Sequence, residues 1–361
     1  MQHEDPLKKI SWTDYQQLSV SDRAPYCLRN NKPYHALFAQ QYDRPIMERV
    51  CELATRIRKI AKTRGGMRFL QDLLAEKRAM LYFSQPSTRT FLSFSAACQI
   101  LGIRTAEVRD TSTSSEIKGE SQEDSVRTFS SYFDLLIMRH PKGGFAERIA
   151  WLLSNSHRPV PVLNAGSGAD QHPTQALLDI YTLQRSFEKR GGIDGKQIAF
   201  VGDLARGRTV RSLACLLAHY QDVKLYFIAP DALQIGSDIL TALDEANMDY
   251  EVTGDFRKII PVADAIYMTR IQDEWDQNHE SRSLDTSAYH FTVNDLPRFK
   301  ADGIIMHPLP RREEIDAAVD RDPRAMYWRQ VRNGMWVRVA LMLFIFEKEK
   351  DVDRYYADLT R

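Results

Sequence analysis

Cysteine is scarce in this chain of 361 residues, and neither sign of charge dominates it. The cysteines form no Cys-x-x-Cys pair and are Cys27, Cys51, Cys98 and Cys215. Their spacing excludes the usual zinc motifs and gives no sign of a disulfide framework. Lys and Arg number 49 and Asp and Glu 48, which leaves a net charge of +1. This balance argues against binding of nucleic acid or a membrane surface by bulk electrostatics, so any anion site must be local.

Long apolar runs are also missing. The longest, Met335 to Phe346, is interrupted by Arg338 and falls short of the ~20 residues that a membrane span requires. We therefore expect a buried terminal helix rather than a membrane anchor. The N-terminus carries Glu4 and Asp5 and has no unbroken apolar segment, so we expect no secretory signal and a cytoplasmic protein.

The length and the strand pattern predict two α/β domains. A chain of 361 residues exceeds the roughly 250–300 residues that one core usually serves. Apolar β-rich runs alternate with helix-like segments, and these runs are Met80 to Phe83, Leu135 to Met138, Val160 to Leu163, Ile198 to Val201, Val223 to Ile228, Ala265 to Met268 and Gly303 to Met306. Because they lack strict apolar–polar alternation, they predict two doubly wound parallel-sheet domains linked by helices.

Composition suggests where these domains begin and end. Residues 1–36 contain three prolines and no sustained periodicity, so they are interpreted as an N-terminal extension. A glycine-rich break, Gly191 to Gly195, separates a first domain, 37–190, from a second, 191–335. Residues 336–361 are expected to form a C-terminal helix that packs back on the first domain.

Polar loops follow most of the predicted strands, at the end where parallel sheets bind ligands. In Ser87-Thr88-Arg89-Thr90 a strand passes into a helix, so backbone N–H groups, hydroxyls and a guanidinium can all face one phosphate. The alternative is a helix cap beside a solvated arginine. Further candidate loops are Arg139-His140, Gly166 to Gln175, Asp203 to Thr209, Thr269 to Gln272 and His307 to Arg311.

Arginine recurs in these loops, at Arg89, Arg139, Arg208, Arg270 and Arg311. A guanidinium matches carboxylates and phosphates bidentately, so several directed into one cleft predict a polyanionic ligand, whereas any one alone is consistent with a surface ion pair. His172 stands at a helix start, where it either caps that helix or donates to a carbonyl oxygen that gains charge. His140 and His307 are interpreted as scaffold.

Neither metal nor nucleotide chemistry is indicated. Gly202 to Thr209 has the spacing of the phosphate loop of nucleotide hydrolases, but Arg208 stands where that loop requires Lys. The sequence has no HExxH motif and no carboxylate cluster with metal-ligand spacing, so we expect a reaction without metal or cofactor.

Together these motifs resemble the aspartate and ornithine carbamoyltransferases, most closely the aspartate branch, from about Leu37 to Phe346. The resemblance assigns the phosphate of carbamoyl phosphate to Ser87, Thr88, Arg89 and Thr90. It assigns contacts with the carbamoyl group to Arg139, His172 and Gln175. Ser114 to Glu120 resembles the loop that enters a neighbouring subunit's site, which adds Ser114 and Lys118 and implies a homotrimer with shared active sites.

The same resemblance assigns the second substrate to the second domain. Residues matching those that bind the aspartate carboxylates are Arg208, Arg270 and Gln272, and the turn whose carbonyls face the amine is Pro308-Leu309. The catalytic set implied is Arg89, Thr90, Arg139, His172 and Lys118. Ornithine enzymes carry Cys where this chain has Thr174 and Leu309, which favours aspartate as the acceptor. Gln85 and Trp275 depart from the family pattern, which leaves room for altered domain closure and a modified dicarboxylate acceptor.

The resemblance implies transfer of the carbamoyl group from carbamoyl phosphate to the amine of L-aspartate, giving N-carbamoyl-L-aspartate for pyrimidine biosynthesis. Ornithine or an acylated ornithine is the alternative acceptor, and a non-enzymatic anion-binding protein is a third reading. A regulatory or dihydroorotase-type partner chain is left open. Neither nucleic acid nor a membrane is expected as a partner.

Overall fold

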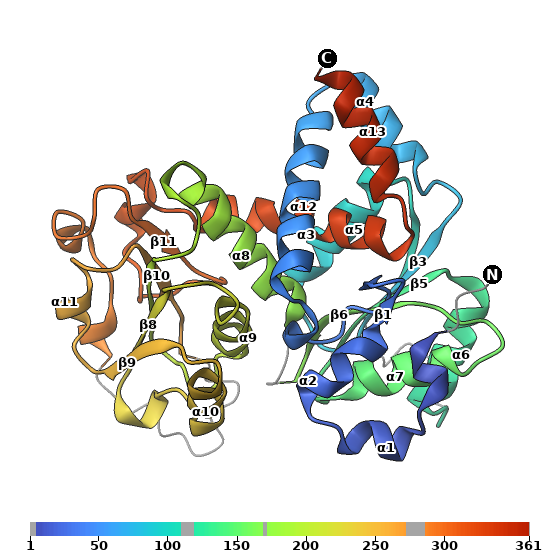
Figure 1. Ribbon diagram of the computed structural model, residues 1–361, viewed down its shortest axis with the longest axis horizontal. Coiled ribbons are helices and arrows are strands. Elements are labelled where there is room, and N and C mark those ends of the chain that lie inside the picture. The colour runs from blue at the N-terminus through green and yellow to red at the C-terminus, as the bar shows by residue number, and fades with distance from the viewer. Residues whose placement is uncertain (1–4, 110–118, 169–171, 272–285, 361) are drawn as a thin grey trace. The chain divides into compact units, whose positions relative to one another are not determined.

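The computed structural model describes residues 5–109, 119–168, 172–271 and 286–360 of the chain (Figure 1). The chain divides into two compact units, Met1–Thr174 with Gly334–Arg361, and Gln175–Asn333. Each unit is built on a parallel sheet, which confirms the predicted fold class. Across the described ranges, no helix has the length and apolar character needed to cross a bilayer. Five residues named above, Glu4, Ser114, Lys118, Gln272 and Trp275, lie outside the described residues.

The first unit contains a four-stranded parallel sheet in the order β4, β3, β5, β6. Its strands are β3 (Arg78–Phe83), β4 (Arg104–Val108), β5 (Leu135–His140) and β6 (Val162–Ser167). β5 and β6 are buried along their whole length, which explains why their sequences lack alternation. The strand order reverses between β3 and β5, so their carboxyl ends form the switch point where such sheets bind ligands.

Helices cover this sheet. They are α3 (Arg44–Ile60), α4 (Arg64–Asp72), α5 (Thr88–Ile100), α6 (Gln122–Tyr132), α7 (Phe145–Ser154), α13 (Glu349–Leu359) and the later part of α12 (Tyr327–Ile345). The charge that interrupts the terminal apolar stretch is buried on α12, where the Arg338 guanidinium donates to Ser93 Oγ at 2.6 Å and lies over the Phe94 ring. This segment is thus a buried helix, as predicted.

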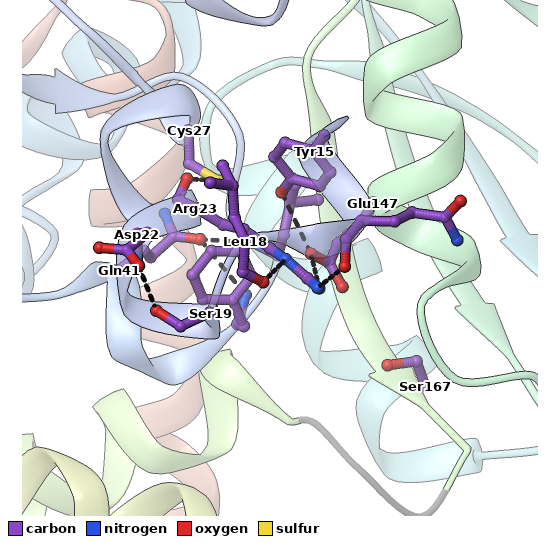
Figure 2. Close-up of polar contacts among 12 residues, drawn as sticks. Tyr15, Leu18, Ser19, Asp22, Arg23, Cys27, Gln41, Glu147 and Ser167 are labelled. Carbon is purple, nitrogen blue, oxygen red and sulfur yellow. Dashed lines mark hydrogen bonds and ion pairs between the residues drawn. The ribbon is translucent and has the colours of Figure 1, made fainter. Parts of the chain in front are cut away.

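The N-terminal segment is an ordered part of the first unit. It forms η1 (Pro6–Lys9), α1 (Trp12–Gln17), α2 (Val20–Arg23), η2 (Ala24–Cys27) and the hairpin β1 (Leu28–Arg29) with β2 (Lys32–Pro33). Leu7, Tyr15 and Cys27 are fully buried in the core that also contains β3, β5 and α7 side chains. Figure 2 shows Glu147 of α7 accepting hydrogen bonds from Tyr15 and Arg23. These helices are too short to show periodicity in the sequence.

The second unit contains a five-stranded parallel sheet in the order β11, β10, β7, β8, β9. Its strands are β7 (Gln197–Val201), β8 (Lys224–Ile228), β9 (Asp249–Thr253), β10 (Ala265–Met268) and β11 (Ile304–Met306). Its helices are α8 (Pro173–Phe187), α9 (Arg208–Leu217), α10 (Ser237–Glu245), α11 (Phe256–Ile259) and the first part of α12. Here the strand order reverses between β7 and β10.

The two units divide at Thr174, inside α8, whereas the sequence pattern suggested a limit at residues 190 and 191. The glycine-rich segment is the point where the helical chain stops, because Gly191 takes a left-handed φ of 82° after η6 (Glu188–Arg190). Almost all of α8 therefore lies in the second unit. Residues Gly334–Arg361 are part of the first unit.

Candidate active site

The Ser87 to Thr90 segment lies at the switch point of the first sheet. Ser87 is the N-cap of α5, yet its side chain makes no capping hydrogen bond. Thr88 and Arg89 are exposed in the first helical turn, and Thr90 is buried. The Ser87 side chain therefore does not support the alternative interpretation as a helix cap. The start of α5 brings together hydroxyls, a guanidinium and backbone N–H groups.

Arg139 and His172 lie near each other in the same unit. Arg139 is the β5 residue paired with Phe83, is buried, and donates from Nη1 to the Ala165 carbonyl at 3.1 Å. The Arg139 carbonyl accepts from the Gln85 N–H at 3.3 Å, which ties the loop after β3 to the end of β5. His172 is buried immediately before α8. This arrangement joins the predicted phosphate and carbamoyl contacts at one sheet edge.

Gly166 begins one of the candidate loops, Gly166 to Gln175, but the sequence reasoning assigned it no role of its own. It takes a φ of 118°, which side chains rarely adopt, and an added Cβ would lie 2.4 Å from Arg139 Nη1 and 3.4 Å from His172 Cδ2. The absence of a side chain at Gly166 is what allows the guanidinium and the imidazole to approach this backbone. A glycine inside a buried strand is the signal that could have found it, because such glycines mark close approaches.

The second unit brings the loops of Arg208 and Arg270 to neighbouring strands. Arg208 is the first residue of α9 after β7, and Arg270 follows β10, with Nη1 donating to the Ile271 carbonyl at 2.8 Å. β7 and β10 pair directly, and Gly202 packs so closely on Thr269 that a Cβ there would lie 2.2 Å from the Thr269 carbonyl oxygen. Both guanidinium-bearing loops thus leave the switch point of this sheet.

A cavity of about 260 Å³ lies in the second unit beside these loops. Its lining includes Gly202, Pro230, Thr269, Ile271, Tyr289 and His290. The lining also includes Arg312, Glu313 and Glu314, so the cavity next to the Arg270 loop carries charges of both signs.

The Pro308-Leu309 turn follows β11 and is held by His307. Leu309 has a φ of 58°, and its N–H donates to His307 Nδ1 at 2.7 Å. Because Nδ1 accepts, the ring proton is on Nε2, which donates to Glu314 Oε1 at 2.7 Å. Burial alone would raise the pKa of Glu314, but the hydrogen bonds from His307 and the Arg312 N–H hold the pKa below its ordinary value. His307 is thus a scaffold residue of a functional turn, and Glu314 was not predicted.

Two predicted residues have partners that define their roles further. The side-chain amide of Gln175 donates to Asp179 Oδ1 at 3.0 Å, one turn further along α8. Arg311 forms a bidentate pair with Asp320 and also donates to the Tyr327 hydroxyl. Arg311 therefore follows the surface ion-pair alternative.

The fold and these loops define a class of protein, the two-domain parallel α/β proteins with arginine-bearing loops at the switch points of their sheets. Sequence models of two domains match the chain. Residues 34–185 match the aspartate/ornithine carbamoyltransferase carbamoyl-P binding domain, and residues 194–345 match the Asp/Orn binding domain. The chain belongs to the aspartate/ornithine carbamoyltransferase family.

Individual relatives agree with this family and favour its aspartate branch. The chain is 40% identical over 310 residues to chloroplastic aspartate carbamoyltransferase 1 of Pisum sativum, covering 84% of this chain and 76% of that protein. It is 42% identical over 292 residues to the aspartate carbamoyltransferase catalytic subunit of Vibrio cholerae, covering 80% and 92%. A solved Trypanosoma cruzi aspartate transcarbamoylase with carbamoyl phosphate and aspartate is 35% identical, with a TM-score of 0.76 and coverage of 86% and 96%. The predicted family is confirmed.

Proposed function

We propose that the first unit binds carbamoyl phosphate, that the second binds L-aspartate, and that the chain makes N-carbamoyl-L-aspartate and phosphate from them. The observation that carries this is the match of both family domains along one chain, with aspartate carbamoyltransferases about 40% identical over most of its length. The enzyme is thus a carbamoyl-group transferase of pyrimidine synthesis. The role of each residue is our proposal.

The proposed reaction proceeds by positioning and electrostatics. The neutral amine of aspartate attacks the carbamoyl carbon, the new C–N bond forms, and the carbon–oxygen bond to phosphate breaks with its electron pair leaving on phosphate. The amine loses its proton to phosphate or solvent. Orientation of the two reactants supplies up to ~7–11 kcal/mol of the barrier. Donors from Thr90, Arg139 and His172 stabilise the carbamoyl oxyanion, and loss of one such donor costs roughly 3–4 kcal/mol.

Arg89 and the hydroxyls of Ser87, Thr88 and Thr90 bind the phosphate in this proposal. Support comes from their common position at the first turn of α5 and from the exposure of Arg89. Four donors around a dianion form charge-assisted hydrogen bonds, each worth roughly 1.5–3 kcal/mol. Phosphate leaves with the charge it gained, so the same groups stabilise the leaving group.

Aspartate is the proposed acceptor, because Arg208 and Arg270 leave neighbouring strands and a dicarboxylate can pair with both. A cationic ornithine side chain would be repelled by the same pair of guanidinium groups. A side-by-side colorimetric assay with L-aspartate, ornithine and acetylornithine tests this acceptor. Carbamoyl aspartate is the expected product, and calorimetric binding of carbamoyl phosphate without turnover of any acceptor would reject the transferase.

A homotrimer with shared sites is the proposed assembly, with Ser114 and Lys118 reaching the neighbouring subunit's site. Light scattering should give three times the 41.6-kDa chain mass. Subunits inactivated by Arg89→Ala and by Lys118→Ala should regain activity when mixed, because some sites then combine two intact contributions. Absence of complementation in mixed trimers would reject shared sites. Because the V. cholerae relative is named a catalytic subunit, the same measurement on cell extract tests for a partner chain.

We also propose that the protein is cytoplasmic and needs no cofactor. The four cysteines are free thiols, which suits a reducing compartment. Because the pea relative is named chloroplastic, cell fractionation is the test that separates these locations. Activity unchanged by dialysis against a chelator is the expected result for a cofactor-free enzyme.

A further inference from the structure

A buried carboxylate lies at the centre of the second unit, where three side-chain donors converge on it. Asp179 of α8 is fully buried, and its Oδ1 accepts from Gln175 Nε2 at 3.0 Å and from Gln330 Nε2 of α12 at 2.6 Å. Its Oδ2 accepts from the Tyr267 hydroxyl of β10 at 2.8 Å. Burying a carboxylate is costly unless donors satisfy it, so this arrangement needs all of its partners.

Gln330 extends this cluster to the turn after β11. Its side chain is 1% exposed, and while Nε2 donates to Asp179, Oε1 accepts from the His307 N–H at 2.9 Å. His307 in turn accepts the Leu309 N–H on Nδ1 at 2.7 Å and donates from Nε2 to Glu314. One amide therefore spans from the carboxylate on α8 to the backbone that carries Pro308 and Leu309.

Each end of this chain of hydrogen bonds fixes a group with a proposed role in the reaction. A carboxylate only accepts, so it holds Nε2 of Gln175 on its own side and turns Oε1 the opposite way. Oε1 is thereby the atom available to accept from the substrate's NH2 group. At the other end, Leu309 holds a left-handed φ of 58°, which persists only where its surroundings support it.

We propose that Asp179 and Gln330 are positioning residues for carbamoyl transfer, which hold the Gln175 amide and the Leu309 turn in one fixed arrangement. This proposal rests on the proposed function, because that function assigns Gln175 to the carbamoyl group and the turn to the amine. Neither Asp179 nor Gln330 need touch a substrate. Their effect is on the geometry of the reacting groups, so it should appear in kcat rather than in the binding of carbamoyl phosphate.

The same pair of helices supplies a matched control one turn away. Asn333 of α12 donates from Nδ2 to Thr182 Oγ1 of α8 at 3.0 Å, and both residues are buried. Like the bond from Gln330 to Asp179, it is donated by a side-chain amide of α12 to α8, but its acceptor is a neutral hydroxyl rather than a carboxylate. Within the described part of the chain, neither Asn333 nor Thr182 forms a hydrogen bond with Gln175 or with the turn. A purely structural role predicts that any loss of kcat follows the loss of stability in both variants.

The test compares Gln330→Met with Asn333→Leu, which replace each amide by an apolar side chain of similar size. For Gln330→Met we expect kcat to fall by about 10- to 100-fold while KM for carbamoyl phosphate stays within about twofold. For Asn333→Leu we expect a measurable but smaller loss of thermal stability, with kcat within about twofold of wild type. Gln330→Asn keeps an amide too short to span both partners, and serves as a second variant if Gln330→Met does not fold.

Hydrogen–deuterium exchange supplies a readout that is independent of activity. The His307 and Leu309 amides should exchange about tenfold faster in Gln330→Met and at the wild-type rate in Asn333→Leu. Unchanged exchange and kcat in Gln330→Met, or equal losses of kcat in both variants, would overturn the positioning role. If the wild-type protein forms no carbamoyl aspartate but the two variants still differ in amide exchange, the proposed function is wrong. The hydrogen-bond connection from Asp179 through Gln330 to the turn would then still hold.

Discussion

Replacing Gly166 with alanine should disable the proposed carbamoyl contacts without removing any polar group. The new Cβ would lie 2.4 Å from Arg139 Nη1, and because ordinary contacts begin near 3.4 Å, the guanidinium would have to retreat by about 1 Å. The retreat opposes the hydrogen bond from Nη1 to the Ala165 carbonyl at 3.1 Å. Displacement of this size at reacting groups can cost about 100-fold in rate.

The cost to stability has a separate origin. Gly166 takes a φ of 118°, and a non-glycine residue held in such a region costs on the order of 1–3 kcal/mol. Gly144 is the matched control, because it has a φ of 70° in the same unit and an added Cβ would meet nothing within 4 Å. Gly144→Ala should therefore lose about 1–2 kcal/mol of unfolding free energy and keep its kcat.

Initial rates of carbamoyl aspartate formation and urea unfolding would be measured on both variants. We expect Gly166→Ala to lose kcat by about 100-fold, corresponding to about 2.7 kcal/mol of transition-state stabilisation. A kcat within about threefold of wild type would show that Arg139 does not need its present position. An equal loss of kcat in Gly144→Ala would show that backbone strain alone causes the effect.

Two further predictions concern charged residues of the first unit. Arg89→Ala should abolish turnover, and because Arg89 is exposed, the substitution should change the free energy of unfolding by no more than about 0.5 kcal/mol. Turnover would be measured by initial rates and stability by urea unfolding. Near-normal activity of this variant would contradict the assignment of Arg89 to the phosphate. Burial alone would raise the pKa of Asp5, but hydrogen bonds and charge from His35 and a hydrogen bond from Ser154 hold that pKa below its ordinary value of 3.8. The ionised Asp5 carboxylate therefore stabilises the folded state fully above pH 3.8, and this stabilisation is lost as the pH falls through the lower pKa of the folded state. Asp5→Asn should therefore be about 1–3 kcal/mol less stable than wild type at pH 7, and this difference in the free energy of unfolding should become smaller at acidic pH. A difference that does not change with pH would contradict the role of the charge.

The strands that the sequence revealed are those buried on both faces. Each of the seven apolar runs overlaps a strand, but β4 and β9 were not predicted. Both are edge strands, and most of their side chains are exposed or half-buried. Polar residues such as Glu107 and Glu251 are compatible with those positions, so no apolar run marks them.

The site shows a similar division between local and long-range information. Residues at the carboxyl ends of buried strands, such as Arg139 near the end of β5 and Arg270 after β10, were predictable because parallel sheets bind ligands there. Asp179 and Gln330 were not, since they meet across 151 positions of sequence and each carries no motif. Gly166 differs from these two residues, because a glycine within a buried strand is a signal in the sequence for a close approach of another group. The sequence analysis considered the polar residues of that loop and did not use this signal.

The N-terminal segment shows that the interior of the first unit is assembled partly from residues ahead of the family domain. The match to that domain begins at residue 34, yet Leu7, Tyr15 and Cys27 fill the same interior as the sheet. Excising the chain at residue 34 would open this apolar surface to water and leave Glu147 without two of its donors. A recombinant fragment meant to be soluble and monodisperse must therefore keep the leading helices.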